Sequence, residues 1–142
     1  MTNQIIQFIQ NHWMLFLAAV VVIALLIFEE IKGKLTGLAK LSAQDAVLLL
    51  NRESAIVIDM RNQKAFGSGH ILGAMNIARS DIDHNAKKLE PHKNQTVILV
   101  DDYDTNTAPV ATKLRAQGFT KICVLAGGLN SWKTAQLPLT KD

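Results

Sequence analysis

The sequence predicts an α/β domain that has a mainly parallel sheet with helices on both faces and is preceded by one N-terminal transmembrane helix. Two observations carry this prediction. Residues 1–28 contain no Lys, Arg, Asp or Glu, whereas all 15 basic and all 12 acidic residues lie from Glu29 onward. In the second part, short β-branched apolar runs alternate with helix-like stretches, as they do where crossover helices join parallel strands.

The first element is the apolar run of residues 13–28, which amounts to about 24 Å of helix. Further apolar residues upstream, at Ile5, Ile6, Phe8 and Ile9, lengthen it enough to span a bilayer with some tilt or thinning. A domain of little more than about 100 residues cannot easily surround a helix that is apolar on every side. We therefore expect residues 13–28 to contact the lipid bilayer. A cleavable signal peptide has basic residues before its apolar run, whereas no Lys or Arg precedes this one. We therefore expect an uncleaved anchor.

The flanking charges predict the orientation of this anchor. Lys32, Lys34 and Lys40 follow the apolar run. Cytoplasmic flanks carry the excess of Lys and Arg, so we expect a single-pass protein of a bacterial inner membrane whose C-terminal domain is cytoplasmic. Residues 29–40 contain two glycines and are interpreted as an irregular juxtamembrane linker, with the folded domain at residues 41–142.

The domain is expected to begin with a helix. Ser42 followed by Asp45 is a capping pattern for a helix that ends near Asn51. Bounded β-branched runs predict strands over residues 55–59, 74–78, 96–100 and 121–125. Between and after them, helices are expected over residues 81–89, 107–117 and 129–135.

The loop after the strand at residues 96–100 is the candidate site. In parallel sheets, ligands bind beyond the carboxyl ends of strands, where loops lead into helix N-termini. A helix N-terminus favours an anion, yet three of this loop's residues are carboxylates. The loop consists of Asp101, Asp102, Tyr103, Asp104, Thr105, Asn106 and Thr107.

Composition excludes several classes of protein. The single cysteine, Cys123, rules out an internal disulfide, and the four histidines are too scattered for a zinc site. A net charge of +3 with 6% aromatic residues gives no basic and aromatic surface for nucleic acid. Cys123 lies in an apolar strand, where a thiol is expected to be buried and inert. No cofactor, metal or nucleic-acid partner is predicted.

From Leu41 to Leu139 the sequence resembles the rhodanese (thiosulfate sulfurtransferase) domains. The motifs are IDMR at residues 58–61, FGSGHILGAMNIA at 66–78, GF at 118–119 and LAGGLNSWKTAQLPL at 125–139, in the family's order and spacing. The resemblance implies the rhodanese fold, with the active loop after the strand at residues 96–100.

In active members of that family the loop begins with a cysteine, which carries sulfane sulfur as a persulfide. Counting back from Thr107, which opens the following helix, the resemblance places Asp101 at the cysteine position. It also places Asp104 where a loop glycine is usual and Asn106 where an arginine commonly holds the anionic substrate. With carboxylates in these places, we expect the loop to repel thiosulfate and phosphate dianions.

Several residues outside the loop permit both a functional and a structural interpretation. Asp59 and Arg61 could form a functional charge pair, but a role in ordering loops at a strand end is favoured. His70 resembles a general base, and a turn histidine is the simpler interpretation because it has no nucleophile to assist. Gly127 and Gly128 fit a close backbone turn better than a phosphate loop. Trp132 is expected in the core or at its rim.

These observations favour a non-catalytic interaction or ligand-binding module, held near an unidentified protein partner in the same membrane. Two alternatives remain open. One is a sulfurtransferase-related or other group-transfer enzyme, for instance one with an aspartyl nucleophile. The other is a divalent-cation site built from the three loop carboxylates, since Mg²⁺ and Ca²⁺ prefer oxygen ligands.

Overall fold

The structure is a computed structural model that describes residues 1–35, 38–52 and 54–141. The chain divides into two compact units, Met1–Gly37 and Leu38–Asp142. The second unit begins within three residues of the expected domain start at residue 41. Each unit is described by itself.

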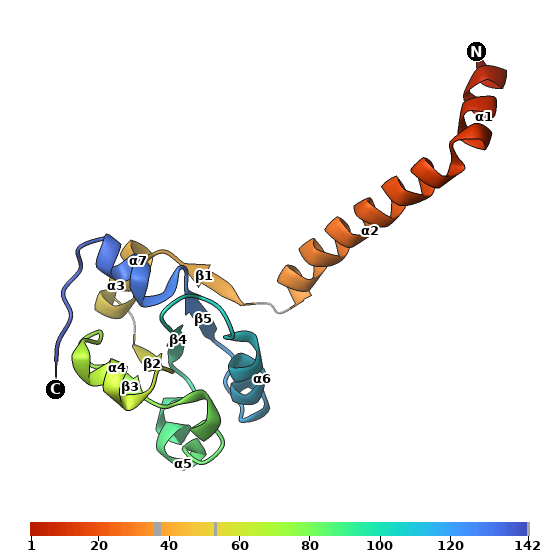
Figure 1. Ribbon diagram of the computed structural model, residues 1–142. Coiled ribbons are helices and arrows are strands. Elements are labelled where there is room, and N and C mark those ends of the chain that lie inside the picture. Colours follow the sequence, from red (N-terminus) through yellow and green to blue (C-terminus); the bar gives the residue numbers. More distant parts are fainter. Residues whose placement is uncertain (36–37, 53, 142) are drawn as a thin grey trace. The chain divides into compact units, whose positions relative to one another are not determined.

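The N-terminal unit consists of two helices, α1 (Thr2–Asn11) and α2 (Trp13–Leu35), which are separated by a break at His12 (Figure 1). Residues Trp13–Ile31 of α2 are long and apolar enough to cross a membrane, and none of them is buried. The expected irregular linker is wrong for residues 29–35, because α2 continues through Gly33 to Leu35. A single glycine inside a helix costs only about 1 kcal/mol, which the rest of a long helix can offset. Residues 36–37 of the expected linker lie outside the described part of the chain.

The second unit is built on a five-stranded sheet in which every pairing is parallel, with the order β1-β5-β4-β2-β3 (Figure 1). The sequence predicts β2 (Ala55–Asp59) and β4 (Thr96–Val100) with the observed bounds, and β5 (Ile122–Leu125) within one residue. The strand expected over residues 74–78 is only β3 (Met75–Asn76). The edge strand β1 (Ala39–Leu41) was not predicted, and its first two residues were wrongly assigned to the linker.

Helices cover both faces of this sheet. α3 (Ala43–Arg52) begins as predicted, since the Asp45 N–H donates to Ser42 Oγ at 3.1 Å and Ser42 Oγ–H donates back to the Asp45 carboxylate at 2.8 Å. α6 (Ala108–Ala116) lies within the predicted range of residues 107–117, and α7 (Gly128–Thr134) begins and ends one residue before the predicted range of 129–135.

Two helical predictions need correction. The helix expected over residues 81–89 is replaced by the 3₁₀ turn η1 (Arg79–Asp81), the short α5 (Ala86–Leu89) and the 3₁₀ turn η2 (Glu90–His92). α4 (Gln63–Ser68) was not predicted, because it has too few residues for an apolar period to show. Its N-terminus is capped by Asn62, whose Oδ1 accepts the Ala65 N–H at 2.8 Å.

The core has one cluster on each face of the sheet. On one face, α6 and the α5 region pack Val110, Leu114 and Leu89 against Ile58 and Leu99. On the other, α3 and α7 pack against the opposite sides of β2, β4 and β5. Since all strands are parallel, their carboxyl ends share one edge, and the loops that leave this edge form the candidate site.

Candidate functional site

The loop between β4 and α6 is held on both sides by neighbouring backbone. The Met60 N–H, which follows β2, donates to the Val100 carbonyl at 2.9 Å. On the other side, the Leu129 N–H at the start of α7 donates to the Asp101 carbonyl at 2.8 Å. These bonds fix residue 101 between the loops that follow β2 and β5.

Gly128 permits this close packing. Its φ of +61° lies in the left-handed region, and a Cβ there would stand 2.5 Å from the Asp101 carbonyl oxygen. Because that oxygen belongs to the backbone, the loop would have to move to admit any side chain at residue 128. The structure thus places the glycine pair of residues 127 and 128 directly against the loop.

Asp101 is a buried and paired carboxylate. The residue is 9% exposed. One carboxylate oxygen accepts the N–H of Asp102 at 2.9 Å, and the other lies 3.2 Å from Nη1 of Arg79. Arg79 begins η1, directly after the segment that contains β3. The loop therefore presents an anionic side chain whose charge is already balanced.

Asp59 and Arg61 form a buried ion pair at the end of β2. Nη2 of Arg61 donates to Asp59 Oδ2 at 2.7 Å and to the Gly69 carbonyl at 2.7 Å, and Nε donates to Asp59 Oδ1 at 3.0 Å. Burial opposes the charge on Arg61, but the hydrogen bond and attraction from Asp59, with smaller contributions from Asp102 and Asp101, raise the pKa of Arg61. The pair joins the β2 loop to the turn that precedes His70.

The other two loop carboxylates also face cations. Asp102 Oδ1 lies 3.7 Å from Nη1 of Arg61, and Asp104 Oδ2 lies 3.0 Å from Nζ of Lys40 in β1. The hydrogen bond from Lys40, together with one from the backbone N–H of Gly127, lowers the pKa of Asp104. Each carboxylate thus has a cation from a different element as its partner.

This pairing corrects the expected charge of the loop. The expected repulsion of anions was argued from the three loop carboxylates alone, whereas the structure places a cation beside each of them. One of these cations, Arg61, is shared with Asp59. Arg79 and Lys40 are the residues that sequence reasoning missed. For Arg79 the available signal was its place directly after the strand predicted over residues 74–78, because the carboxyl ends of parallel strands meet at one edge. Lys40 gave no such signal, because it lies in β1, which was not predicted.

The remaining loop residues form its outer rim. Tyr103, Thr105 and Asn106 are exposed, while Thr107 is buried where the chain enters α6. Asn106 has a φ of +58°, a left-handed conformation that asparagine tolerates better than most residues. The loop therefore turns sharply at residue 106 before the helix begins.

Three candidate residues lie outside this cluster of charges. His70 is buried, its ring stacks on Phe66, and its Nδ1 lies 2.9 Å from the Phe66 carbonyl, so that nitrogen carries the proton. Trp132 is buried in the core cluster of α7, and its Nε1 donates to the Pro138 carbonyl at 3.1 Å. Cys123 pairs in register with Ile98, three residues before Asp101, which is about 10 Å along a strand.

A cavity of about 390 Å³ opens beside the charged cluster. Its charged lining consists of Arg61, Arg79, Asp101 and Asp102. Within residues 1–35, 38–52 and 54–141, no group of three His, Cys, Asp or Glu side chains is arranged to hold a metal ion. The loop carboxylates instead diverge toward three different cations. The cavity can bind a polar group, and it presents carboxylate oxygen rather than sulfur to that group.

Comparison with known proteins identifies the fold family. Residues 42–135 match the family described as rhodanese-like domain. The chain belongs to the rhodanese-like domain family. The uncharacterized protein YibN of Escherichia coli strain K12 is 31% identical over 140 residues, which cover 98% of each chain.

Other relatives agree with this assignment. The thiosulfate sulfurtransferase GlpE of Pseudoalteromonas translucida is 26% identical over 95 residues, which cover 67% of this chain and 89% of that protein. The crystal structure of the Alr3790 protein from Anabaena superposes with a TM-score of 0.64 at 27% identity, over 72% of this chain and 82% of that one. The rhodanese-like domain is therefore preceded here by an apolar helix that could span a membrane.

Proposed function

We propose that this protein is a membrane-anchored, non-catalytic rhodanese-like module that binds a ligand or protein partner. The observation that carries the proposal is Asp101. It occupies the start of the loop after β4, where the family resemblance places the sulfur-carrying cysteine. Its carboxylate is buried, hydrogen-bonded and paired with Arg79. A carboxylate has no sulfur atom to hold a second sulfur as a persulfide.

The chain offers no replacement for that cysteine. Its only thiol, Cys123, lies within β5 and not in the loop. A reactive thiol needs an exposed and electropositive setting, whereas Cys123 is partly buried in a central strand. Both facts support a function that depends on binding.

The test is a sulfur-transfer assay on the full chain in detergent. Thiosulfate and cyanide are supplied, and formation of thiocyanate and sulfite is measured for the wild type, Asp101→Ala and a protein-free control. We expect all three rates to coincide. A wild-type rate well above the control, abolished by Asp101→Ala, would establish the group-transfer alternative. The similarity to a thiosulfate sulfurtransferase supports this alternative.

The anchor is the second part of the proposal. We infer that α2 holds the protein in a bacterial inner membrane with residues 38–142 in the cytoplasm. The match to the Escherichia coli relative covers 98% of the chain, so it includes most of the N-terminal helices as well as the domain. Lysines at residues 32, 34 and 40 follow the apolar run, and no Lys or Arg precedes it.

Protease protection tests this orientation. The protein is expressed in a bacterial host, and protease is added either to spheroplasts or to inverted membrane vesicles. We expect the C-terminal domain to survive in spheroplasts and to be digested in inverted vesicles. The reverse pattern would place the domain on the outer side of the membrane.

A further inference from the structure

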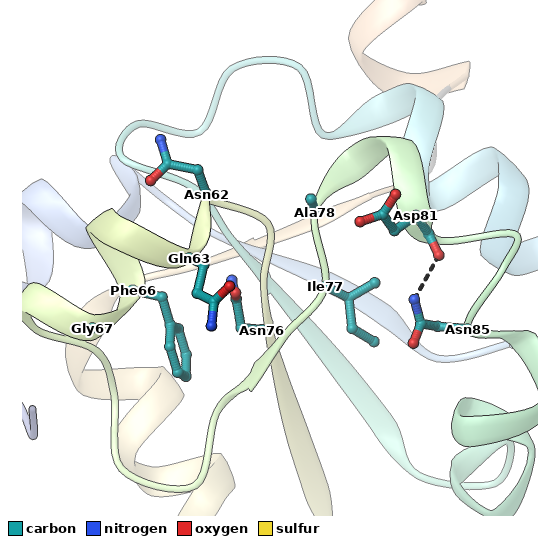
Figure 2. Close-up of a pocket in the computed structure, with 9 residues that line it drawn as sticks. All are labelled: Asn62, Gln63, Phe66, Gly67, Asn76, Ile77, Ala78, Asp81 and Asn85. Atoms are coloured by element: carbon teal, nitrogen blue, oxygen red, sulfur yellow. Dashed lines mark hydrogen bonds between the residues drawn. The ribbon is translucent and has the colours of Figure 1, made fainter. Parts of the chain in front are cut away.

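A second and larger cavity lies beside the charged site, between α4 and residues 76–85 (Figure 2). Its volume is about 670 Å³, within the range of about 300–1,000 Å³ that is typical of small-molecule sites. It shares Asn62 and Ala78 with the cavity at Asp101, so the two cavities adjoin. Its polar lining side chains are Asn62, Gln63, Asn76, Asp81 and Asn85.

Hydrogen bonds orient two of these amides. Nδ2 of Asn76 donates to the carbonyls of Asp59 and Arg61, at 3.2 and 2.8 Å. Nδ2 of Asn85 donates to the Asp81 carbonyl at 2.8 Å, the bond drawn in Figure 2. Since the NH₂ groups are engaged with backbone, each amide has its Oδ1 left to accept hydrogen bonds.

The cavity also has an unbalanced negative charge. Asp81 is its one charged lining residue, and one oxygen of that carboxylate accepts a hydrogen bond from Ser80 Oγ at 3.1 Å. In the described part of the chain, no Lys, Arg or His lies within ion-pair distance of Asp81, in contrast to Asp101, Asp102 and Asp104. Figure 2 shows Gln63 and Asn76 on the α4 side of the cavity, with Asp81 and Asn85 on the opposite side.

An apolar floor completes the cavity. Phe66 and Ile77 line it and are both buried. The cavity thus combines two oriented carbonyl oxygens and one carboxylate with a surface that suits hydrocarbon. A complementary ligand donates several hydrogen bonds, carries a positive charge and has a short apolar stem.

We propose that this cavity binds a small organic cation in which a guanidinium or ammonium group is carried on a short alkyl chain. Asp81 serves as the counter-ion, Asn76 and Asn85 accept N–H bonds, and Phe66 with Ile77 contacts the stem. The inference deepens the proposed function, on which it rests, because it gives the binding module a ligand class.

Calorimetric titration of the full chain in detergent with agmatine tests the proposal. We expect saturable binding at one site per chain. Asp81→Asn should weaken it about tenfold, since a hydrogen bond to a charged group becomes a neutral one. Gln63→Glu should tighten it, because it adds a second negative charge to the lining. Asp83→Asn is the matched control, since Asp83 pairs with Lys113 and is not among the lining residues, and should leave binding unchanged.

Butylurea has a similar alkyl stem and planar head but lacks both the guanidinium charge and the terminal ammonium of agmatine, so it should bind much more weakly. Absence of saturable agmatine binding to the wild type, equal affinity for butylurea, or equal effects of Asp81→Asn and Asp83→Asn would overturn the proposal. Failure here is distinguishable from failure of the proposed function. Thiocyanate formation in the sulfur-transfer assay overturns the non-catalytic role whatever the titration shows. If no thiocyanate forms and agmatine does not bind, only the present inference is overturned.

Discussion

At the scale of single residues, the site depends on charges that are paired across elements. The side chains of Asp59 and Arg61 are 1% and 4% exposed, whereas those of Asp83 and Lys113 are 58% and 42% exposed. A buried ion pair is costly to break, because the remaining charge loses its partner without regaining water. An exposed pair contributes little.

This contrast gives a first prediction. Asp59→Asn should lower the free energy of unfolding by about 3–5 kcal/mol, because the buried Arg61 guanidinium would then have only the more distant Asp102 carboxylate, at 3.7 Å, as its ion-pair partner. Asp83→Asn should change it by less than about 1 kcal/mol. Chemical denaturation of the full chain in detergent measures both. Equal losses in the two variants would contradict a structural role for the buried pair.

Gly128 allows a second prediction with an internal control. Gly128→Ala should destabilise the protein more than Gly73→Ala does. Both glycines have positive φ, at +61° and +80°, so an alanine costs about 1–2 kcal/mol at either position. Only at residue 128 would the new Cβ also meet the Asp101 carbonyl, at 2.5 Å, while nothing lies within 4 Å at residue 73. Equal falls in melting temperature for the two variants would show that the loop at residues 101–107 moves to admit the new Cβ at little cost.

Asp104 gives a prediction about pH. Because the pKa of Asp104 is lowered from the ordinary 3.8, the folded chain holds this proton less tightly than the unfolded chain does. The pair with Lys40 therefore adds stability above about pH 4, and this contribution is lost as the pH falls through the lowered pKa. Lys40 is 62% exposed, so solvent limits the contribution to less than about 1 kcal/mol.

The measurement compares Lys40→Met with the wild type by denaturant unfolding at neutral pH and well below pH 3.8. The variant should be slightly less stable at neutral pH and equal to the wild type in acid. A stability difference that grows on acidification would contradict the assigned pair.

At the scale of secondary structure elements, the sequence predicts most accurately what is buried and regular. The strands β2 and β4 have every residue apolar apart from a terminal Asp59 and Thr96, and their bounds were predicted correctly. The short elements β1, β3 and α4 have two to six residues, too few to show a period. Tertiary contacts, such as the register of Ala39 with Cys123, are what order them.

The same limit explains the candidate site. The loop at residues 101–107 was located because a strand, a polar run and a helix follow one another in the sequence. Its electrostatics were not predicted, because Arg79 and Lys40 reach the loop from the chain segments around β3 and β1. Their proximity depends on strand order, β1-β5-β4-β2-β3, which the alternation of elements does not specify.

The helix α2 gives a prediction at this scale. Replacing Val21 and Leu25 together with arginine should release much of the protein from the membrane pellet, because two charges near the middle of a span oppose insertion by about 5–7 kcal/mol in total. Leu48→Arg, on an exposed position of α3, is the control and should leave the protein in the pellet. Retention of the double variant at the wild-type level would show that α2 does not span the bilayer.

At the scale of the whole molecule, an apolar helix is joined to a rhodanese-like domain whose loop carboxylates are each paired with a cation. The membrane attachment that we propose would confine the domain to a thin layer and raise its effective concentration toward partners in the same bilayer, so that weak contacts would suffice. The adjoining cavities at Asp101 and Asp81 offer such contacts two chemically different surfaces, one with paired charges and one with a net negative charge.

Intact-mass spectrometry of the full chain after incubation with thiosulfate tests the central claim, that this rhodanese-like site carries no sulfur. The account predicts an unchanged mass, with or without subsequent reductant. A gain equal to one sulfur atom in most molecules, removed by reductant, would contradict it. Persistence of that gain in Cys123→Ser would locate the sulfur outside the only thiol of the chain.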